Sequence, residues 1–190
     1  NKFFLTNLEL PRIQKLKLNL KLNQIKFFYD SPNLDNINIK SRKKRIFKNI
    51  NTKNQFLNFM CKNIYQVLPT NFIENFYEIE KYIETLNWPK NPDLIMTSYS
   101  HYADEAFKIY TVNKIVNGAK FIILQHGNQG HHNYCGTFYE KRICDKYITW
   151  GNNSKENKTI PLFITTNMGK KILKTKPKGI LFKLTEFPLT

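Results

Sequence analysis

Apolar residues recur at three- and four-residue spacing along residues 55–68, and this spacing predicts an amphipathic helix. Pro69 ends the helix, because the residue before a proline avoids helical geometry. Thr70 can cap a second helix, whose apolar positions continue to Leu86. We expect the aromatic side chains of both helices to fill a core, and we assign them no chemistry.

The N-terminal part of the chain has a different pattern. Apolar residues alternate with basic or polar ones, as in the run from Leu16 to Leu20. A period of two predicts a strand with one face in water. Residues 1–54 are therefore expected to form an irregular region that contains a strand.

The middle of the chain reads as strand, helix, strand. Leu94–Thr97 is a short apolar run, and Lys120–Leu124 is a continuous one, typical of a strand covered on both faces of its sheet. Between them, a polar loop over residues 98–102 precedes a helix that ends at Gly118, a residue suited to a C-terminal cap. This order is a parallel, right-handed βαβ unit. A further strand is expected over residues 145–150.

These elements predict an α/β fold with a Rossmann-like parallel sheet over residues 55–168, which holds a weak last strand at Ile160–Thr165. Residues 169–190 are expected to be a linker followed by Ile180–Leu184, the first strand of a second domain. Because the chain starts at Asn1 and ends just after that strand, we expect it to be truncated.

The chain is strongly basic, with 30 Lys and Arg against 14 Asp and Glu and a net charge of +16. The basic residues are spread along the chain, so codon bias in an AT-rich genome explains the excess better than a nucleic-acid partner does. The run Arg42–Arg45 keeps a basic nucleic-acid-binding module open as an alternative, although no recognised motif accompanies it. A basic surface would favour anionic substrates such as nucleotide-sugars.

Cysteine usage and hydropathy bear on the compartment. Cys61, Cys135 and Cys144 are odd in number and lack CxxC spacing, which argues against a disulfide framework. No apolar run reaches about 18 residues, so no membrane span is predicted. A cytoplasmic location fits best, and association with the inner face of the membrane stays open.

Candidate chemistry gathers where the predicted strands end. Ligands of open parallel sheets bind beyond the carboxyl ends of the strands. His101 follows one strand, and His126 follows the next one directly, so we expect the two histidines to share a crevice. An imidazole there can take a proton from an acceptor hydroxyl or donate a hydrogen bond to a phosphate. A histidine that merely caps a loop is the alternative.

Other residues near these ends carry weaker signals. The segment from Gly127 to Gly130 matches neither GxGxxG nor a Walker A loop. Asp104 and Glu105 could be catalytic carboxylates, but acids at this place more often favour a helix N-terminus.

Metal and thiol chemistry receive little support. His131 and His132 raise a metal hypothesis together with His126, but their spacing fits no common zinc site, and we expect no metal. No feature singles out Cys135 or Cys144 as a nucleophile, and small buried thiols are common.

These residues resemble a bacterial family of surface-carbohydrate transferases, the LIC12162-type transferases. The likeness covers about residues 60–185 and is most specific at Gln125-His126-Gly127 and Thr149-Trp150-Gly151, which match the family's QHGG-type and isD-x-y-x-tWGW segments. The chain departs from this pattern at Asn128, in place of a glycine, and at Asn152, in place of a tryptophan. Further matches lie at Leu68-Pro69, His101, Asp104-Glu105, Phe107-Lys108, Gly118-Ala119, Gly130, Tyr134 and Cys144–Ile148.

The resemblance implies a GT-B-like two-domain fold, similar to that of GT-B glycosyltransferases and CDP-glycerol glycerophosphotransferases. This chain would be the N-terminal, acceptor-side half of such an enzyme. The implied reaction moves a glycosyl or glycerophosphate group from a nucleotide-activated donor, such as a nucleotide-sugar or a CDP-glycerol-like molecule, to a glycan or lipid-linked acceptor. It belongs to surface polysaccharide biosynthesis and needs no cofactor.

On this hypothesis His126 is the catalytic base or phosphate donor, and His101 supports it. Gln125 orients the loop, and Gly127 and Gly130 let a ligand approach closely. The remaining substrate-binding candidates are Asn128, Asp104, Glu105 and Tyr134. A nucleic-acid-binding module and an inactive truncated remnant are the alternatives.

Overall fold

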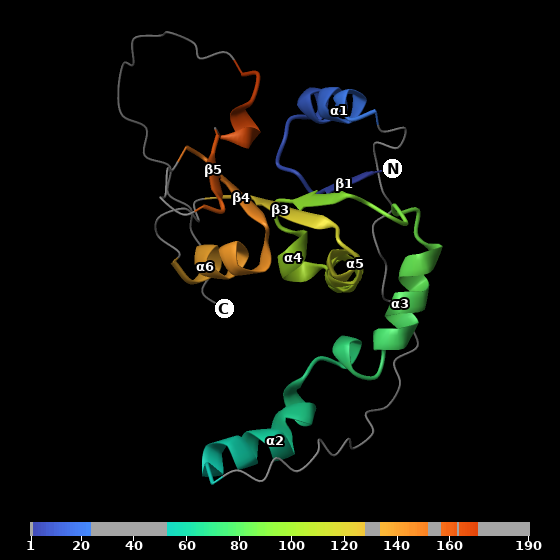
Figure 1. The fold of residues 1–190 in the computed structure, drawn as a ribbon, viewed down its shortest axis with the longest axis vertical. Coiled ribbons are helices and arrows are strands. Elements are labelled where there is room, and N and C mark those ends of the chain that lie inside the picture. The colour runs from blue at the N-terminus through green and yellow to red at the C-terminus, as the bar shows by residue number, and fades with distance from the viewer. Residues whose placement is uncertain (1, 24–52, 128–133, 152–156, 163, 171–190) are drawn as a thin grey trace, which may run out of the picture.

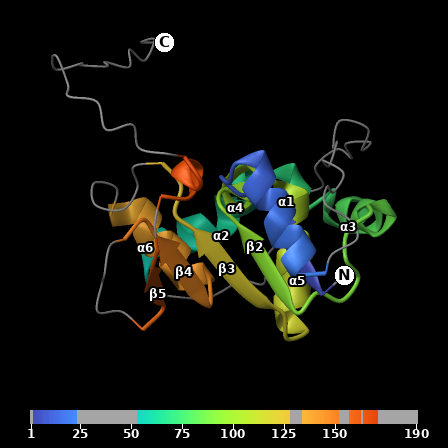
Figure 2. The same cartoon turned by 90° about the horizontal axis from the view of Figure 1, so that it is seen from above.

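A computed structural model describes residues 2–23, 53–127, 134–151, 157–162 and 164–170 (Figure 1). Its centre is a five-stranded parallel sheet in the order β1-β2-β3-β4-β5. Figure 2 looks onto this sheet and shows neighbouring strands side by side. The strands are β1 (Phe3–Thr6), β2 (Leu94–Thr97), β3 (Lys120–Leu124), β4 (Lys146–Thr149) and β5 (Thr159–Pro161).

Helices cover both faces of the sheet. Helix α1 (Arg12–Lys21) lies on one face, and α4 (Ser100–Ala103), α5 (Glu105–Val116) and α6 (Tyr134–Ile143) lie on the other (Figure 1). Helix α3 (Phe76–Thr85) packs on α5, whereas α2 (Gln55–Val67) extends away from the sheet (Figure 1). Short 3-10 helices occupy Thr70–Phe72 and Thr165–Asn167. The predicted Rossmann-like α/β architecture is confirmed.

Alternate residues of the strands feed two apolar clusters, one on each face, as a period of two requires. Phe4 and its neighbours on that face pack with Trp88 and Tyr110, at ring-centroid distances of 5.0 Å in both cases. On the other face, Leu5 and Leu124 pack with α1. The two clusters hold the strands in register, so the carboxyl ends of β2, β3 and β4 meet at one edge.

The predicted βαβ unit is confirmed, including its ends. Strands β2 and β3 have the predicted bounds, and the intervening helix α5 is followed by Gly118, whose φ of +97° is the left-handed conformation expected of a C-terminal cap. The loop expected over residues 98–102 is partly helical, because α4 begins at Ser100.

The N-terminal expectation is wrong at residues 16–20, which lie in helix α1 and not in a strand. Leu18 and Leu22 are four residues apart and pack together against the sheet, while Leu16 and Leu20 are 47% and 61% exposed. The alternation therefore mixes the two faces of one helix. The strand of this region is β1, which pairs with β2 and so joins the N-terminal residues to the main sheet.

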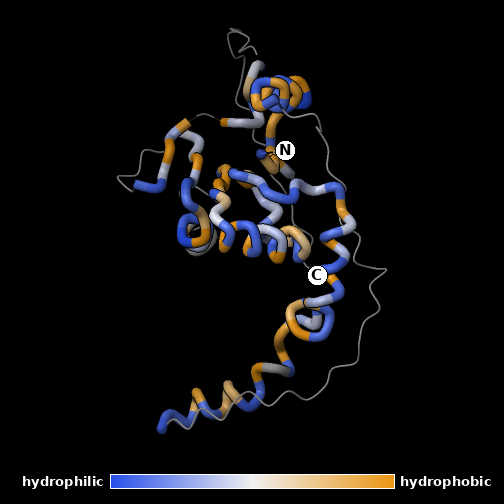
Figure 3. Tube along the Cα trace, turned by 45° about the vertical axis from the view of Figure 1, so that its right-hand side comes forward, coloured by the Kyte–Doolittle hydropathy of each residue, from blue (hydrophilic) through white to orange (hydrophobic). Residues whose placement is uncertain are grey.

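The expectation that α2 fills a core is also wrong. Phe56, Phe59 and Val67 are 61% or more exposed, and Figure 3 shows apolar positions along α2 where it extends from the sheet. An apolar stripe predicts the helix but not what covers it. The second helix starts at Phe76 and not at Thr70, because a 3-10 turn intervenes.

Three further predictions concern membrane spans, cysteines and the C-terminal strand. None of the described helices is long and apolar enough to cross a membrane. Cys61 and Cys144 are free thiols. The predicted strand Ile180–Leu184 lies outside the described residues.

Candidate functional site at the carboxyl edge of the sheet

The carboxyl edge brings the two predicted histidines together. His101 lies in α4, just after β2, and His126 follows β3. Their ring centroids are 6.5 Å apart with an interplanar angle of 25°. The parallel pairing of β2 with β3 accounts for this, because it places the segments after both strands at the same edge.

Aromatic rings surround His126. The ring of Tyr102 lies 5.5 Å from it and is nearly parallel, at 20°, and the ring of Tyr99 lies 6.1 Å away. Tyr102 also contacts His101, at 4.2 Å between centroids. His126 itself is half-buried, so its imidazole keeps a path to solvent while three rings limit its movement.

His101 contacts a buried carboxylate that the sequence did not reveal. Its Nε2 lies 3.2 Å from Oε1 of Glu140, and the two side chains are 3% and 0% exposed. Glu140 comes from α6, three residues before Ile143 and four before Cys144, both of which pack into the core. This spacing places an acid on the inner face of a helix, and it is the one signal in the sequence that could have found Glu140.

The buried groups around this pair lack well-formed hydrogen bonds. Among the described residues, neither oxygen of Glu140 nor Nδ1 of His101 has a hydrogen-bond partner, and the 3.2 Å contact is poorly aligned for a hydrogen bond. Burial, and the nearby carboxylate of Glu140, raise the pKa of Tyr102 and of Tyr147 far above the ordinary value. Buried polar groups are nearly always satisfied, so such a cluster marks a candidate functional site.

A hydrogen bond joins the two segments that carried the family resemblance. Gln125 is 5% exposed, and its Oε1 accepts a 2.9 Å bond from the backbone N–H of Trp150. Its own backbone N–H donates to the carbonyl of Ile148 at 2.7 Å. Gly127 then takes a φ of +55°, a left-handed conformation that favours glycine. The loop after β3 is thus tied to β4 just before His126.

Comparison with known proteins decides the family. The model of the LIC12162 family transferases matches residues 1–190. The chain belongs to the LIC12162 family of transferases. No curated protein and no solved structure matches it. The predicted family and the transferase class are thereby confirmed.

In this family member, the acids proposed near the site begin helix α5. Asp104 is its N-cap, and Oδ1 accepts a 2.8 Å hydrogen bond from the N–H of Phe107. Burial raises the pKa of Asp104 above its ordinary value. Glu105 pairs with Lys108 at 3.7 Å, one turn along the same helix. These contacts match the helix-terminus interpretation.

Two residues predicted for the transferase site, Asn128 and Gly130, lie outside the described part of the chain. The same holds for His131 and His132 of the metal hypothesis and for the basic run Arg42–Arg45 of the nucleic-acid alternative. Tyr134 begins α6, but its side chain is also outside the described part. Within the described ranges, no group of three or more His, Cys, Asp or Glu side chains is arranged to hold a metal ion.

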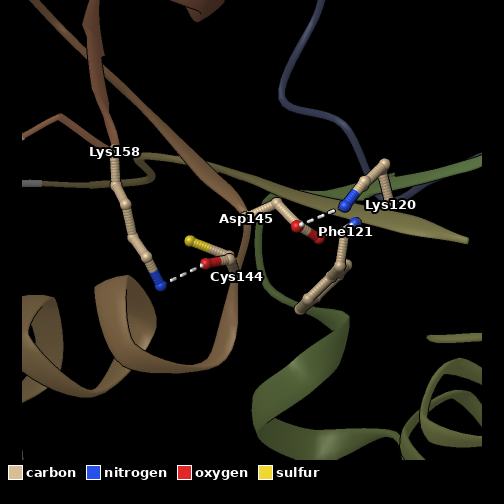
Figure 4. Close-up of polar contacts among 5 residues, drawn as sticks. All are labelled: Lys120, Phe121, Cys144, Asp145 and Lys158. Atoms are coloured by element: carbon tan, nitrogen blue, oxygen red, sulfur yellow. Dashed lines mark hydrogen bonds and ion pairs between the residues drawn. The ribbon is translucent and has the colours of Figure 1, made fainter. Parts of the chain in front are cut away.

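The opposite, amino edge of the transferase sheet is held by charged side chains (Figure 4). Oδ2 of Asp145 accepts a 2.9 Å bond from the N–H of Phe121, and its Oδ1 lies 3.2 Å from Nζ of Lys120. Burial raises the pKa of Asp145, but these two partners outweigh it, and the pKa is lowered overall. Asp145 belongs to the family-like segment, so part of that motif serves the fold.

Lys158 closes the end of α6 at the same edge. Its Nζ donates to the carbonyls of Cys144 and Lys141, at 3.0 and 3.3 Å. An open pocket of about 540 Å³ lies beside it, lined by Phe138, Lys141, Arg142, Asn157 and Lys158. Cations at a helix C-terminus are favoured by its dipole, which explains this basic cluster without a ligand.

Proposed function

We propose that the chain is the acceptor-side half of a GT-B-like transferase in surface polysaccharide biosynthesis, with His126 as the catalytic base. It would move a glycosyl or glycerophosphate group from a nucleotide-activated donor to a glycan or lipid-linked acceptor. The observation that supports this most is the position of His126. It stands beyond the carboxyl end of β3, half-buried and flanked by His101 and Tyr102.

In the proposed reaction, His126 performs one step, the removal of a proton. Its unprotonated nitrogen takes the proton of an acceptor hydroxyl while that oxygen attacks the anomeric carbon of a sugar or the phosphorus of a glycerophosphate. The bond from that atom to the leaving nucleotide phosphate breaks, and the phosphate oxygen takes the electron pair. Gly127 supports close approach of the acceptor because its backbone carries no side chain.

The charge of the protein supports an anionic donor. A net charge of +16 attracts phosphorylated molecules over a range of about 10 Å at ordinary ionic strength. Peripheral association with anionic lipids at the inner face of the membrane, where a lipid-linked acceptor would lie, follows from the same charge.

The test is the variant His126→Ala in the full natural protein. Donor cleavage is measured as nucleotide release from CDP-glycerol and from a panel of nucleotide-sugars, in the presence of membrane-derived acceptors. We expect turnover to fall by roughly 100-fold or more, the usual contribution of a general base. Lys90→Ala, at an exposed position ahead of β2, is the matched control and should keep full turnover.

Two results would overturn the proposal. One is unchanged turnover in a folded His126→Ala protein. The other is a wild-type protein that cleaves none of these donors, which would leave the family's transferase chemistry to another class of substrate.

A further inference from the structure

Glu140 is a buried carboxylate that has no part in the reaction step described above. Its side chain is 0% exposed, in the interior face of α6. Burying a carboxylate costs free energy that an ion pair recovers only with good geometry, and an apolar residue would pack here at lower cost. Packing alone therefore gives no reason for an acid at this position.

The groups around Glu140 are the same ones that enclose His126. Oε1 lies 3.2 Å from Nε2 of His101. Burial, together with the charge of the same carboxylate, raises the pKa of Tyr102. The rings of His101 and Tyr102 contact each other at 4.2 Å, and each also faces His126, at 6.5 and 5.5 Å. Glu140 thus lies against Nε2 of His101, and His101 and Tyr102 are in contact with each other and flank His126.

We propose that Glu140 is a positioning residue for His126, acting through the rings of His101 and Tyr102. A carboxylate beside Nε2 of His101 favours the tautomer and the orientation in which that nitrogen carries its N–H. The ring of Tyr102, which contacts that of His101, lies nearly parallel to the imidazole of His126. The inference rests on the proposed function, in which His126 is the reacting group.

The decisive variant is Glu140→Gln, which keeps the shape of the side chain and removes its charge. Nitrogen-15 NMR of the four histidine rings reports the proton position on each ring without any substrate. Signals are assigned with His101→Gln and His126→Gln. We expect the ring signals of both His101 and His126 to shift in Glu140→Gln. Glu84→Gln, the same change at an exposed position of α3, should shift neither.

Turnover supplies the second readout. Glu140→Gln should lower kcat about 10-fold and leave KM within about twofold, because Glu140 acts on the catalytic group and not on substrate binding. Glu140→Asp, which keeps the charge, should recover part of the loss. If Glu140→Gln does not fold, Tyr102→Phe removes only the hydroxyl at a position that is 38% exposed. It should lower kcat about threefold and move the His126 signal.

The outcomes separate this inference from the proposed function. If His126→Ala abolishes turnover while Glu140→Gln or Tyr102→Phe leaves kcat and the histidine signals unchanged, the positioning role is refuted and His126 keeps its place. If His126→Ala leaves turnover unchanged, the function itself fails, and the inference fails with it.

Discussion

Two groups of polar side chains, one at each edge of the same parallel sheet, differ in their hydrogen bonding. At the amino edge, Asp145 and Lys158 each make two polar contacts, and those contacts tie β3 to β4 and close the end of α6. At the carboxyl edge, Glu140, His101 and Nε1 of Trp150 are buried, yet they have no hydrogen-bond partner among the described residues.

We propose that this difference separates residues that stabilise the fold from residues of the proposed site. A satisfied polar group at a strand end contributes to stability, whereas an unsatisfied buried one lowers it. Sites of function commonly carry that cost. The segments that resemble the family lie at both edges. Asp145 stabilises the fold at the amino edge, whereas His126 lies beside the unsatisfied buried groups at the carboxyl edge.

The largest expected effect concerns the ion pair at the carboxyl edge. His101→Leu leaves Glu140 buried without its counterpart, and we expect the free energy of unfolding to fall by about 3 kcal/mol. The double variant with Glu140→Leu removes both polar side chains and should recover most of that loss, since apolar replacements of buried pairs are often neutral or stabilising. Urea unfolding followed by circular dichroism measures both.

A control keeps this comparison specific. The pair Lys108→Leu and Glu105→Leu removes a partly exposed ion pair, and it should cost little whether its members are changed singly or together. If the double variant His101→Leu/Glu140→Leu is as unstable as the sum of its single variants, the carboxyl edge contributes to stability after all.

The next effect belongs to the amino edge. Asp145→Ala removes the acceptor of the Phe121 N–H and the partner of Lys120, and it should lower the free energy of unfolding by about 2 kcal/mol. Turnover per folded molecule should not change, because the contacts of Asp145 with other described residues lie at the amino edge. A loss of turnover in the folded fraction would contradict the division between the edges.

The same variant has a pH signature. The pKa of Asp145 is lowered on folding from an ordinary value of 3.8, so its stabilisation is complete above that value. As the pH falls through the folded-state pKa, the carboxylate is protonated in both states and the contribution disappears. The difference in stability between wild type and Asp145→Ala should therefore shrink below about pH 4, as urea titrations at several pH values would show.

The sequence predicted the sheet where local signals and burial agree. Strands β2 and β3 are short apolar runs, and helix α5 between them carries its own cap residues, Asp104 and Gly118. Helix α1 was mistaken for a strand because alternate leucines fit both periods, and only packing distinguishes them. The exposed face of α2 could not be foreseen, since a helical stripe does not identify its neighbour.

For the candidate site, the rule that parallel strand ends converge was sufficient to bring His101 and His126 together. Glu140 was missed because a glutamate in a helix is usually exposed. Its burial depends on how α6 rotates onto the sheet, and the spacing of Glu140 from the apolar Ile143 and Cys144 is the only sequence signal of that rotation.

A smaller change in stability tests whether Asp104 acts as a helix cap or binds substrate. Asp104→Ala removes the cap of α5 and should cost about 1 kcal/mol, whereas Asp104→Asn keeps an acceptor for Phe107. Because burial raises the folded-state pKa of Asp104, its charged form is disfavoured at neutral pH. Asp104→Asn should then be at least as stable as wild type at pH 7, with the advantage disappearing at acid pH. Lost turnover in stable Asp104→Asn would instead assign it to substrate binding.

The smallest effect measures how tightly the amino edge is closed. Burial raises the pKa of the Cys144 thiol to about 11, so it reacts with a thiol reagent at pH 8 mainly from opened states, in which the ordinary pKa returns. Lys158→Met removes the two bonds from Nζ to Lys141 and Cys144, and a loss of about 0.7 kcal/mol would raise the labelling rate of Cys144 roughly threefold.

Cys61, in α2, is the reference within each sample and should label at the same rate in both proteins. Mass spectrometry of the labelled peptides gives both rates. An equal rise at the two cysteines would mean that Lys158 stabilises the whole chain, and no rise at Cys144 would mean that this edge is held by Asp145 without help from Lys158.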